Sequence, residues 1–135
     1  MKYALFTDGG ARGNPGPAAA GVVLKDAKGN IVTELGMYLG TCTNNEAEYR
    51  ALVYGLETAK RHGVSDISCF LDSELVVRQL NGQYKVKDAN LRGFYTKVKE
   101  LGLGFSSISY THIFRSKNRE ADTVVNQVLD AENNE

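Results

Sequence analysis

The sequence is poor in cysteine and proline, lacks tryptophan, carries no net charge and contains no long apolar run. Its two cysteines, Cys42 and Cys69, are too few for a disulfide framework, so we expect both to stay reduced in the cytoplasm. Sixteen Lys and Arg residues balance sixteen Asp and Glu residues, which excludes a protein that holds nucleic acid through bulk positive charge. No apolar run approaches the ~18 residues of a membrane helix. The N-terminus reaches Asp8 before an export signal forms, so we expect no membrane association.

The remaining composition is that of a globular protein. The 135 residues are 42% hydrophobic and 24% charged, and a chain of this length builds its core without metal or disulfide support. We therefore expect one domain spanning residues 1–131, with a frayed polar end at residues 132–135. We also expect a monomer.

The pattern of apolar and turn-forming residues predicts a mixed α/β fold. Three apolar segments separated by turn residues predict antiparallel strands at residues 2–7, 18–25 and 31–39. A helix is predicted to start after the N-cap Thr43, with Glu46 as its capping-box partner, and to end at residues 62–63. Strand, helix, helix, strand and helix then follow at residues 67–71, 73–82, 90–101, 105–114 and 118–131. Strands joined through helices favour parallel pairing, so one sheet should hold an antiparallel meander and parallel strands.

Four acidic residues lie on four separate predicted elements. Asp8 and Asp72 each follow an apolar strand, and ligands usually bind at the carboxyl ends of parallel strands. Glu48 and Asp122 lie near the starts of helices. Each residue alone is explained as a turn residue or as a favourable charge at a helix N-terminus. Together they could converge on one point, where their repulsion requires a cation, and oxygen-only ligands suit Mg²⁺ or Mn²⁺.

Side-chain amides lie near the same predicted edge. Thr43, Asn44 and Asn45 stand at a helix start, where backbone N–H groups favour phosphate. Asn14 lies in the glycine-rich segment after the first strand. Amide side chains can donate hydrogen bonds to minor-groove acceptors or to 2′-hydroxyl groups. Turn geometry and helix capping explain these residues equally well when each is taken alone.

Four segments, taken together, resemble the signatures of type 1 ribonucleases H over nearly the whole chain. They are TDGGARGNPGPAAAG, TNNEAEYRAL, LDSELVVRQL and NREADTVVN. The resemblance is closest to the compact branch of bacteria and archaea and to ribonuclease H domains related to reverse transcriptases. It implies a ribonuclease H-like α/β fold, with a five-stranded mixed sheet flanked by helices. It also implies Mg²⁺-dependent endonucleolytic cleavage of the RNA strand of RNA–DNA hybrids, leaving 5′-phosphate and 3′-hydroxyl ends.

The resemblance also implies roles for individual residues. Two metal ions, Mg²⁺ with Mn²⁺ as a substitute, would be held by Asp8, Glu48, Asp72 and Asp122. Glu46 would then be an exposed capping residue, because Glu48 is the glutamate that matches the family pattern. Arg115 would assist catalysis at the phosphate. Substrate contacts are implied at Gly10, Asn14, Thr43, Asn44, Asn45 and Glu74.

Three departures from the family pattern concern the substrate and the loop before Asp122. Glu74 stands where relatives commonly carry glutamine, and a carboxylate cannot donate a hydrogen bond to a base. The basic insertion of longer relatives is missing between residues 82 and 89, which predicts weak hybrid binding. Arg115 occupies the loop where longer relatives carry a histidine, and His112, at the end of a predicted strand, is the alternative for that role.

Three other functions stay open at this point. A nuclease of the same fold could act on double-stranded RNA. A hybrid-binding module could have lost catalysis, although the presence of all four carboxylates argues against it. A nucleotide-binding domain could use the glycines of residues 9–16 as a phosphate loop, but no Gly-Lys-Ser/Thr sequence follows them.

Overall fold

A five-stranded mixed sheet forms the centre of the protein, whose residues 1–133 are described by the computed structural model. The strand order is β3-β2-β1-β4-β5, with bounds Lys2–Ala11 (β1), Gly16–Lys25 (β2), Ile31–Cys42 (β3), Asp66–Leu71 (β4) and Ser107–His112 (β5). The pairs β1–β2 and β2–β3 are antiparallel, whereas β4 pairs in parallel with both β1 and β5. The predicted fold class, an antiparallel meander followed by parallel strands, is confirmed.

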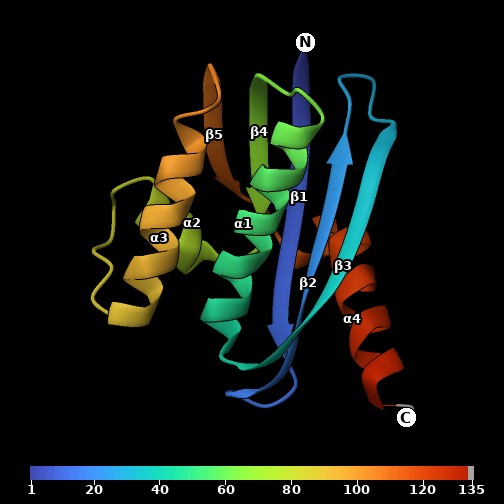
Figure 1. The fold of residues 1–135 in the computed structure, drawn as a ribbon, viewed down its shortest axis with the longest axis vertical. Helices are drawn as coiled ribbons and strands as arrows, with labels where there is room; N and C mark the ends of the chain where they lie inside the picture. Colours follow the sequence, from blue (N-terminus) through green and yellow to red (C-terminus); the bar gives the residue numbers. More distant parts are fainter. Residues whose placement is uncertain (134–135) are drawn as a thin grey trace.

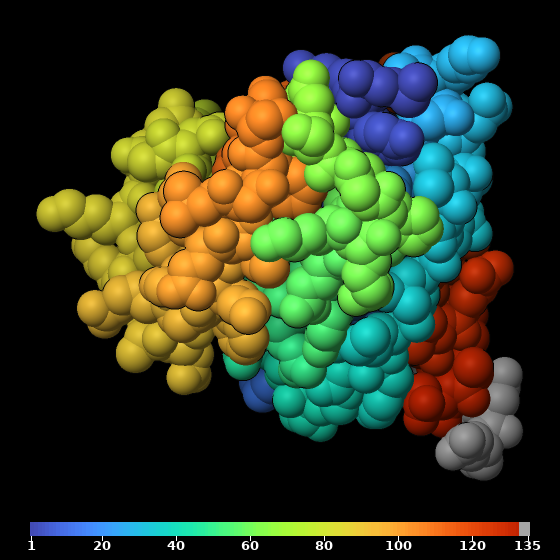
Figure 2. Space-filling view, turned by 45° about the horizontal axis from the view of Figure 1, so that its top comes forward, coloured from blue at the N-terminus to red at the C-terminus, as the bar shows by residue number. Residues whose placement is uncertain are grey.

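Helices cover both faces of this sheet (Figure 1). Helices α1 (Asn44–Arg61), α2 (Glu74–Leu80) and α3 (Ala89–Gly102) lie on one face, and α4 (Arg119–Asn133) packs on β1, β2 and β3 from the other. Figure 2 shows α3 beside α1 on the first face. The α1 N-terminus has the predicted capping box, in which Thr43 Oγ1 accepts from the Glu46 N–H and Glu46 Oε1 accepts from the Thr43 N–H.

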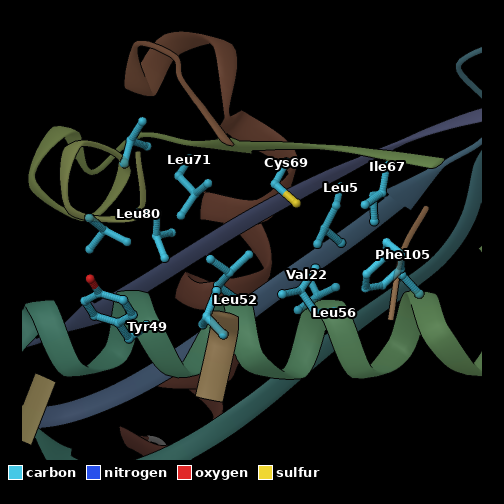
Figure 3. Packing of buried hydrophobic residues seen from close by; sticks show 14 of the residues in the cluster. Leu5, Val22, Tyr49, Leu52, Leu56, Ile67, Cys69, Leu71, Leu80 and Phe105 are labelled. Atoms are coloured by element: carbon cyan, nitrogen blue, oxygen red, sulfur yellow. The ribbon is translucent and has the colours of Figure 1, made fainter. Parts of the chain in front are cut away.

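The main hydrophobic core lies between α1 and the central strands. Leu52 and Leu56 of α1 point toward Leu5 of β1 and toward the β4 residues Ile67 and Leu71, as Figure 3 shows. All five side chains are fully shielded from solvent. Each stabilises the fold by about 1.5–3 kcal/mol through burial, so α1 is held rigidly against β1 and β4. That rigidity matters because Asp8 lies on β1, Glu48 lies on α1, and Asp72 directly follows β4.

Several element bounds differ from those expected. Strand β1 continues to Ala11 instead of ending at residue 7, because Asp8, Gly9 and Gly10 still pair with β2. Gly9 and Gly10 look like turn residues in the sequence. In the structure they stay in the strand, where the missing side chain of Gly9 allows α1 to approach β1 closely. The last strand is shorter than predicted, and a 3₁₀ turn over Arg115–Lys117 precedes α4.

The C-terminal helix ends later than expected. Helix α4 continues to Asn133, two residues past the predicted end at residue 131. Residues 134–135 of the expected frayed end lie outside the described residues. None of the helices in residues 1–133 combines the length and apolar character that a membrane span requires.

The close approach of β1 to α1 gives a first prediction. A Cβ atom on Gly9 would lie 2.2 Å from the backbone carbonyl of Ala47, so Gly9→Ala should lower the free energy of unfolding by about 3 kcal/mol or more. The matched control is Gly93→Ala in α3, where a Cβ meets nothing within 4 Å and should stabilise by about 0.5–1 kcal/mol. Urea unfolding of both variants measures the difference. Equal stabilities would mean that β1 and α1 are not in backbone contact.

Candidate functional site

Two of the predicted carboxylates lie side by side at the carboxyl end of β4. The last parallel pair between β1 and β4 is Thr7 with Leu71, so Asp8 is the next residue of β1 and Asp72 is the first residue after β4. Glu48 approaches them from the first turns of α1, where its Oε1 accepts a 2.7 Å hydrogen bond from the Gly9 N–H. Ligand oxygens of Asp8, Glu48 and Asp72 all lie within 4.8 Å of one another. Carboxylate oxygens this close together are suited to binding a shared cation.

The fourth carboxylate, Asp122, lines the same cavity from α4. The cavity has a volume of about 460 Å³, and its walls include Gly10, Asn44 and Asn45. Asp122 Oδ1 accepts a 3.0 Å hydrogen bond from the Arg115 guanidinium, which also lines the cavity. Arg115 is 76% exposed, so this ion pair is open to solvent and contributes little to stability.

Burial and the charge of neighbouring carboxylates make Asp8 and Glu48 hard to ionise. Burial, and then the charge of Asp72, raise the pKa of Asp8 to about 7. Burial, and then the charge of Asp8, raise the pKa of Glu48 well above its usual range. The second Glu48 oxygen, Oε2, is buried and has no hydrogen-bond partner among the described residues. A divalent cation would relieve the repulsion and satisfy that oxygen, so the donor set fits a metal ion.

A buried asparagine, Asn118, joins the strand ends to α4. Its Nδ2 donates a 2.9 Å hydrogen bond to the Thr7 carbonyl and a 3.0 Å hydrogen bond to Asp72 Oδ2. The residue is only 1% exposed and stands directly before α4. Sequence patterns alone assign this role to no residue. Asn118 is the first residue of the NREADTVVN segment, in which only Asp122 is predicted to have a function.

The asparagines beside the cavity hold the local backbone with their oxygens. Asn44 Oδ1 accepts from the Ala11 N–H at 2.9 Å, and Asn14 Oδ1 accepts from the Asn44 N–H at 3.0 Å. These contacts fix the amide orientation, so the donor NH₂ groups are the ends left for another ligand. Thr43 is half-buried and engaged in the capping box, and Glu46 lies outside the carboxylate cluster.

One predicted substrate contact, Glu74, and the alternative loop residue, His112, lie away from the acidic cavity. Glu74 is exposed and pairs with Arg78 at 3.5 Å, outside the lining of the acidic cavity. His112 lines a different cavity, with Phe6 and Phe70. Of the two candidates for the loop role, Arg115 is therefore the one at the carboxylates.

Comparison with known proteins identifies the family of the chain. The family described as "Reverse transcriptase-like" matches residues 6–128. The chain belongs to the ribonuclease H family. Ribonuclease HI of Halobacterium salinarum is 46% identical over 125 residues, which are 93% of this chain and 63% of that protein. The chain thus spans less than two thirds of that relative's length.

Solved ribonuclease H structures superpose closely. The ribonuclease H1 structure from Halobacterium salinarum has a TM-score of 0.95 and 44% identity, covering 97% of this chain and 99% of that one. LC11 ribonuclease H1, solved in complex with an RNA/DNA hybrid, has a TM-score of 0.92 and 42% identity, covering 96% and 98%. These two superpositions show that the chain has the ribonuclease H fold.

The raised pKa of Asp8 predicts how stability depends on pH without metal. Folding raises this pKa from 3.8 to about 7, so the folded state holds the proton to higher pH than the unfolded state. Stability should therefore fall as the pH rises from about 4 to about 7. Asp8→Asn should remove much of this fall and raise the melting temperature at pH 7.5.

Thermal melts in EDTA from pH 4.5 to pH 8 test this expectation. Added Mg²⁺ should raise the wild-type melting temperature more at pH 7.5 than at pH 5, because the cation competes with the proton. Glu46→Gln, which changes a carboxylate outside the cluster, should keep the wild-type profile. A wild-type stability that rises steadily to pH 8 in EDTA would contradict the prediction.

Proposed function

We propose that this ribonuclease H-family protein hydrolyses the RNA strand of RNA–DNA hybrids with divalent cations, leaving 5′-phosphate and 3′-hydroxyl ends. The observation that carries the proposal is the cluster of Asp8, Glu48 and Asp72 oxygens within 4.8 Å at a polar cavity. The hybrid complex of the LC11 relative supports the choice of substrate. We assign the activity to one domain over residues 1–131, as expected from the sequence.

The carboxylates are the proposed ligands of two Mg²⁺ ions, with Mn²⁺ as a substitute. Asp8, Glu48 and Asp72 would hold one ion, and Asp8 with Asp122 the second. Metal ions at such a site supply an activated water and stabilise the charge of the leaving oxygen. The protein's part is to keep the ligands in place: the Gly9 N–H orients Glu48, and Asn118 orients Asp72.

Substrate binding is assigned to the groups around the cavity mouth. Asn14 and Asn44 can donate their NH₂ hydrogens to minor-groove acceptors or 2′-hydroxyl groups, because their oxygens are already engaged. Asn45 and Gly10 line the cavity, and Thr43 stands at the N-terminus of α1, where phosphate is favoured. Glu74 cannot donate a hydrogen bond to a base and does not line the acidic cavity, so its proposed contact with the substrate lies outside that cavity.

The test is cleavage of end-labelled duplexes by the purified chain. The panel holds an RNA–DNA hybrid, an RNA duplex and a DNA duplex of one sequence, each with Mg²⁺, with Mn²⁺ and with EDTA. We expect metal-dependent cleavage of the RNA strand of the hybrid alone. Preferential cleavage of the RNA duplex would assign the other substrate. Hybrid binding without cleavage in either metal would indicate a binding module. The expected monomer and cytoplasmic location stay predictions.

The two glutamates of α1 give a matched pair of variants. Glu48 points into the carboxylate cluster, whereas Glu46 accepts hydrogen bonds from Thr43 at the helix start. Glu48→Gln should lower kcat by roughly two orders of magnitude or more, because a charged carboxylate ligand becomes a neutral amide. Glu46→Gln keeps a capping-box side chain and should stay within about threefold of wild type. Steady-state hydrolysis of the labelled hybrid measures both. A larger loss for Glu46→Gln would reverse the assignment.

Arg115 and His112 form a second pair. The Asp122 carboxylate raises the pKa of Arg115, so its guanidinium stays charged beside the cavity at every working pH. If Arg115 stabilises phosphate charge in the transition state, Arg115→Ala should lower kcat about tenfold or more, and Arg115→Lys should recover part of it.

His112→Ala is the control for that role. His112 lies outside the acidic cavity, so its removal should leave both kcat and the shape of the pH–rate profile unchanged. A silent Arg115→Ala together with loss of a neutral-pH limb in His112→Ala would exchange the two roles.

A further inference from the structure

Part of the α4 side of the sheet is open. Helix α4 packs on β1, β2 and β3, and Figure 1 shows it behind β2 and β3, away from β4 and β5. On this open part lies a second cavity of about 470 Å³, beside the aromatic residues of neighbouring strands. Its lining residues are Phe6, Phe70, His112, Ile113, Phe114 and Lys117. We call this surface the aromatic face.

Aromatic rings dominate the aromatic face. Phe6 on β1 and Phe70 on β4 are register partners, and their rings stack with centroids 5.0 Å apart. His112 and Phe114 meet edge to face at 6.0 Å. Phe114 is 75% exposed, so most of its ring is accessible to a partner. Two aromatic rings on adjacent central strands of an uncovered sheet also form the base-stacking platform of RNA-recognition domains.

The charges on the aromatic face favour a polyanion. The cavity lining contains Lys117 and no carboxylate, and Lys117 has no ion-pair partner within residues 1–133. Lys25 lies over the Phe6 ring at 5.1 Å, although it also pairs with Glu120. Along β5, the exposed Thr111 is the register neighbour of Phe70 and supplies a hydroxyl group. Rings, cations and hydroxyl groups together suit bases, phosphates and riboses better than they suit an apolar peptide.

The aromatic face adjoins the acidic cavity through one short segment. Phe114 belongs to the aromatic face, and the next residue, Arg115, lines the acidic cavity and bonds Asp122. On β1, Phe6 precedes Asp8 by two residues, so this ring and this carboxylate share one side of the sheet, and Phe70 stands two residues before Asp72 in the chain. A strand that leaves the acidic cavity across this segment would reach the aromatic face directly.

We propose that the aromatic face binds single-stranded nucleic acid, stacking bases on Phe114 and the Phe6–Phe70 pair while Lys117 contacts a phosphate. This site would hold unpaired RNA or DNA next to a duplex that occupies the acidic cavity. It goes beyond hybrid cleavage, which needs only the carboxylates and the duplex contacts.

The test is the binding of fluorescein-labelled oligothymidylate and oligouridylate of twelve nucleotides, followed by anisotropy at low salt in EDTA. Phe114→Leu keeps an apolar side chain but removes the ring, and should weaken binding roughly fivefold or more. Phe114→Trp should bind as tightly as wild type or tighter. Lys117→Ala should weaken binding and lower the slope of log affinity against log salt by about 0.7. Leu103→Ala is the control, since Leu103 is 86% exposed and lies outside the aromatic face.

Three outcomes would overturn this assignment. The first is no single-strand binding by the wild type, or binding that Phe114→Leu and Lys117→Ala leave unchanged. The second is equal loss in Phe114→Leu and Phe114→Trp, which would indicate shape and not stacking. The third is a wild-type dimer in gel filtration that Phe114→Leu dissociates, which would assign the face to a second copy of the chain. Binding in EDTA does not depend on hybrid cleavage, so this test and the cleavage test fail separately.

Discussion

The carboxylates of Asp8, Glu48 and Asp72 repel one another at the end of β4, and the surrounding elements must hold them together against that repulsion. Asp8, Glu48 and Asp72 have oxygens within 4.8 Å of one another, and burial with mutual charge raises the pKa of Asp8 and of Glu48. Such an arrangement opposes folding when the groups are ionised, and it persists only where the surrounding fold is strong enough to impose it. A cation bound among these oxygens would relieve the repulsion and so stabilise the folded state.

The fold holds these carboxylates together through backbone contacts and through packed side chains. Gly9 lets α1 approach β1 so closely that its N–H reaches Glu48, and the packed leucines between α1 and the sheet keep that approach rigid. Asn118 joins Thr7 of β1 and Asp72 after β4 to the start of α4, and this connection fixes the position of Asp122 relative to Asp8 and Asp72. Each carboxylate therefore lies on or next to a different element, and the Glu48 and Asp72 carboxylates themselves accept hydrogen bonds that join these elements.

Much of this arrangement could be predicted from the sequence. Apolar strands followed by an aspartate, and a capping box before Glu48, locate three carboxylates, because the pairing of parallel strands brings their ends together. The continuation of β1 through Asp8 could not be predicted, since glycines that permit helix approach look like glycines that form turns. The Asn118 contacts depend on a side chain meeting a backbone carbonyl 111 residues away, which no local pattern encodes. The exposed ring of Phe114 likewise carries no local signal of its neighbours Phe6 and Phe70.

The most direct test of the cation site is the position of bound metal in the protein itself. Crystals grown with Mn²⁺, measured at a wavelength where manganese scatters anomalously, should show a peak within coordination distance of Asp8, Glu48 and Asp72. A second peak toward Asp122, with Arg115 displaced from that carboxylate, would complete the two-ion arrangement. Crystals of the Asp8→Asn variant should lose the first peak. An anomalous map at millimolar Mn²⁺ that is empty at these three residues, or that places manganese elsewhere, would contradict the account.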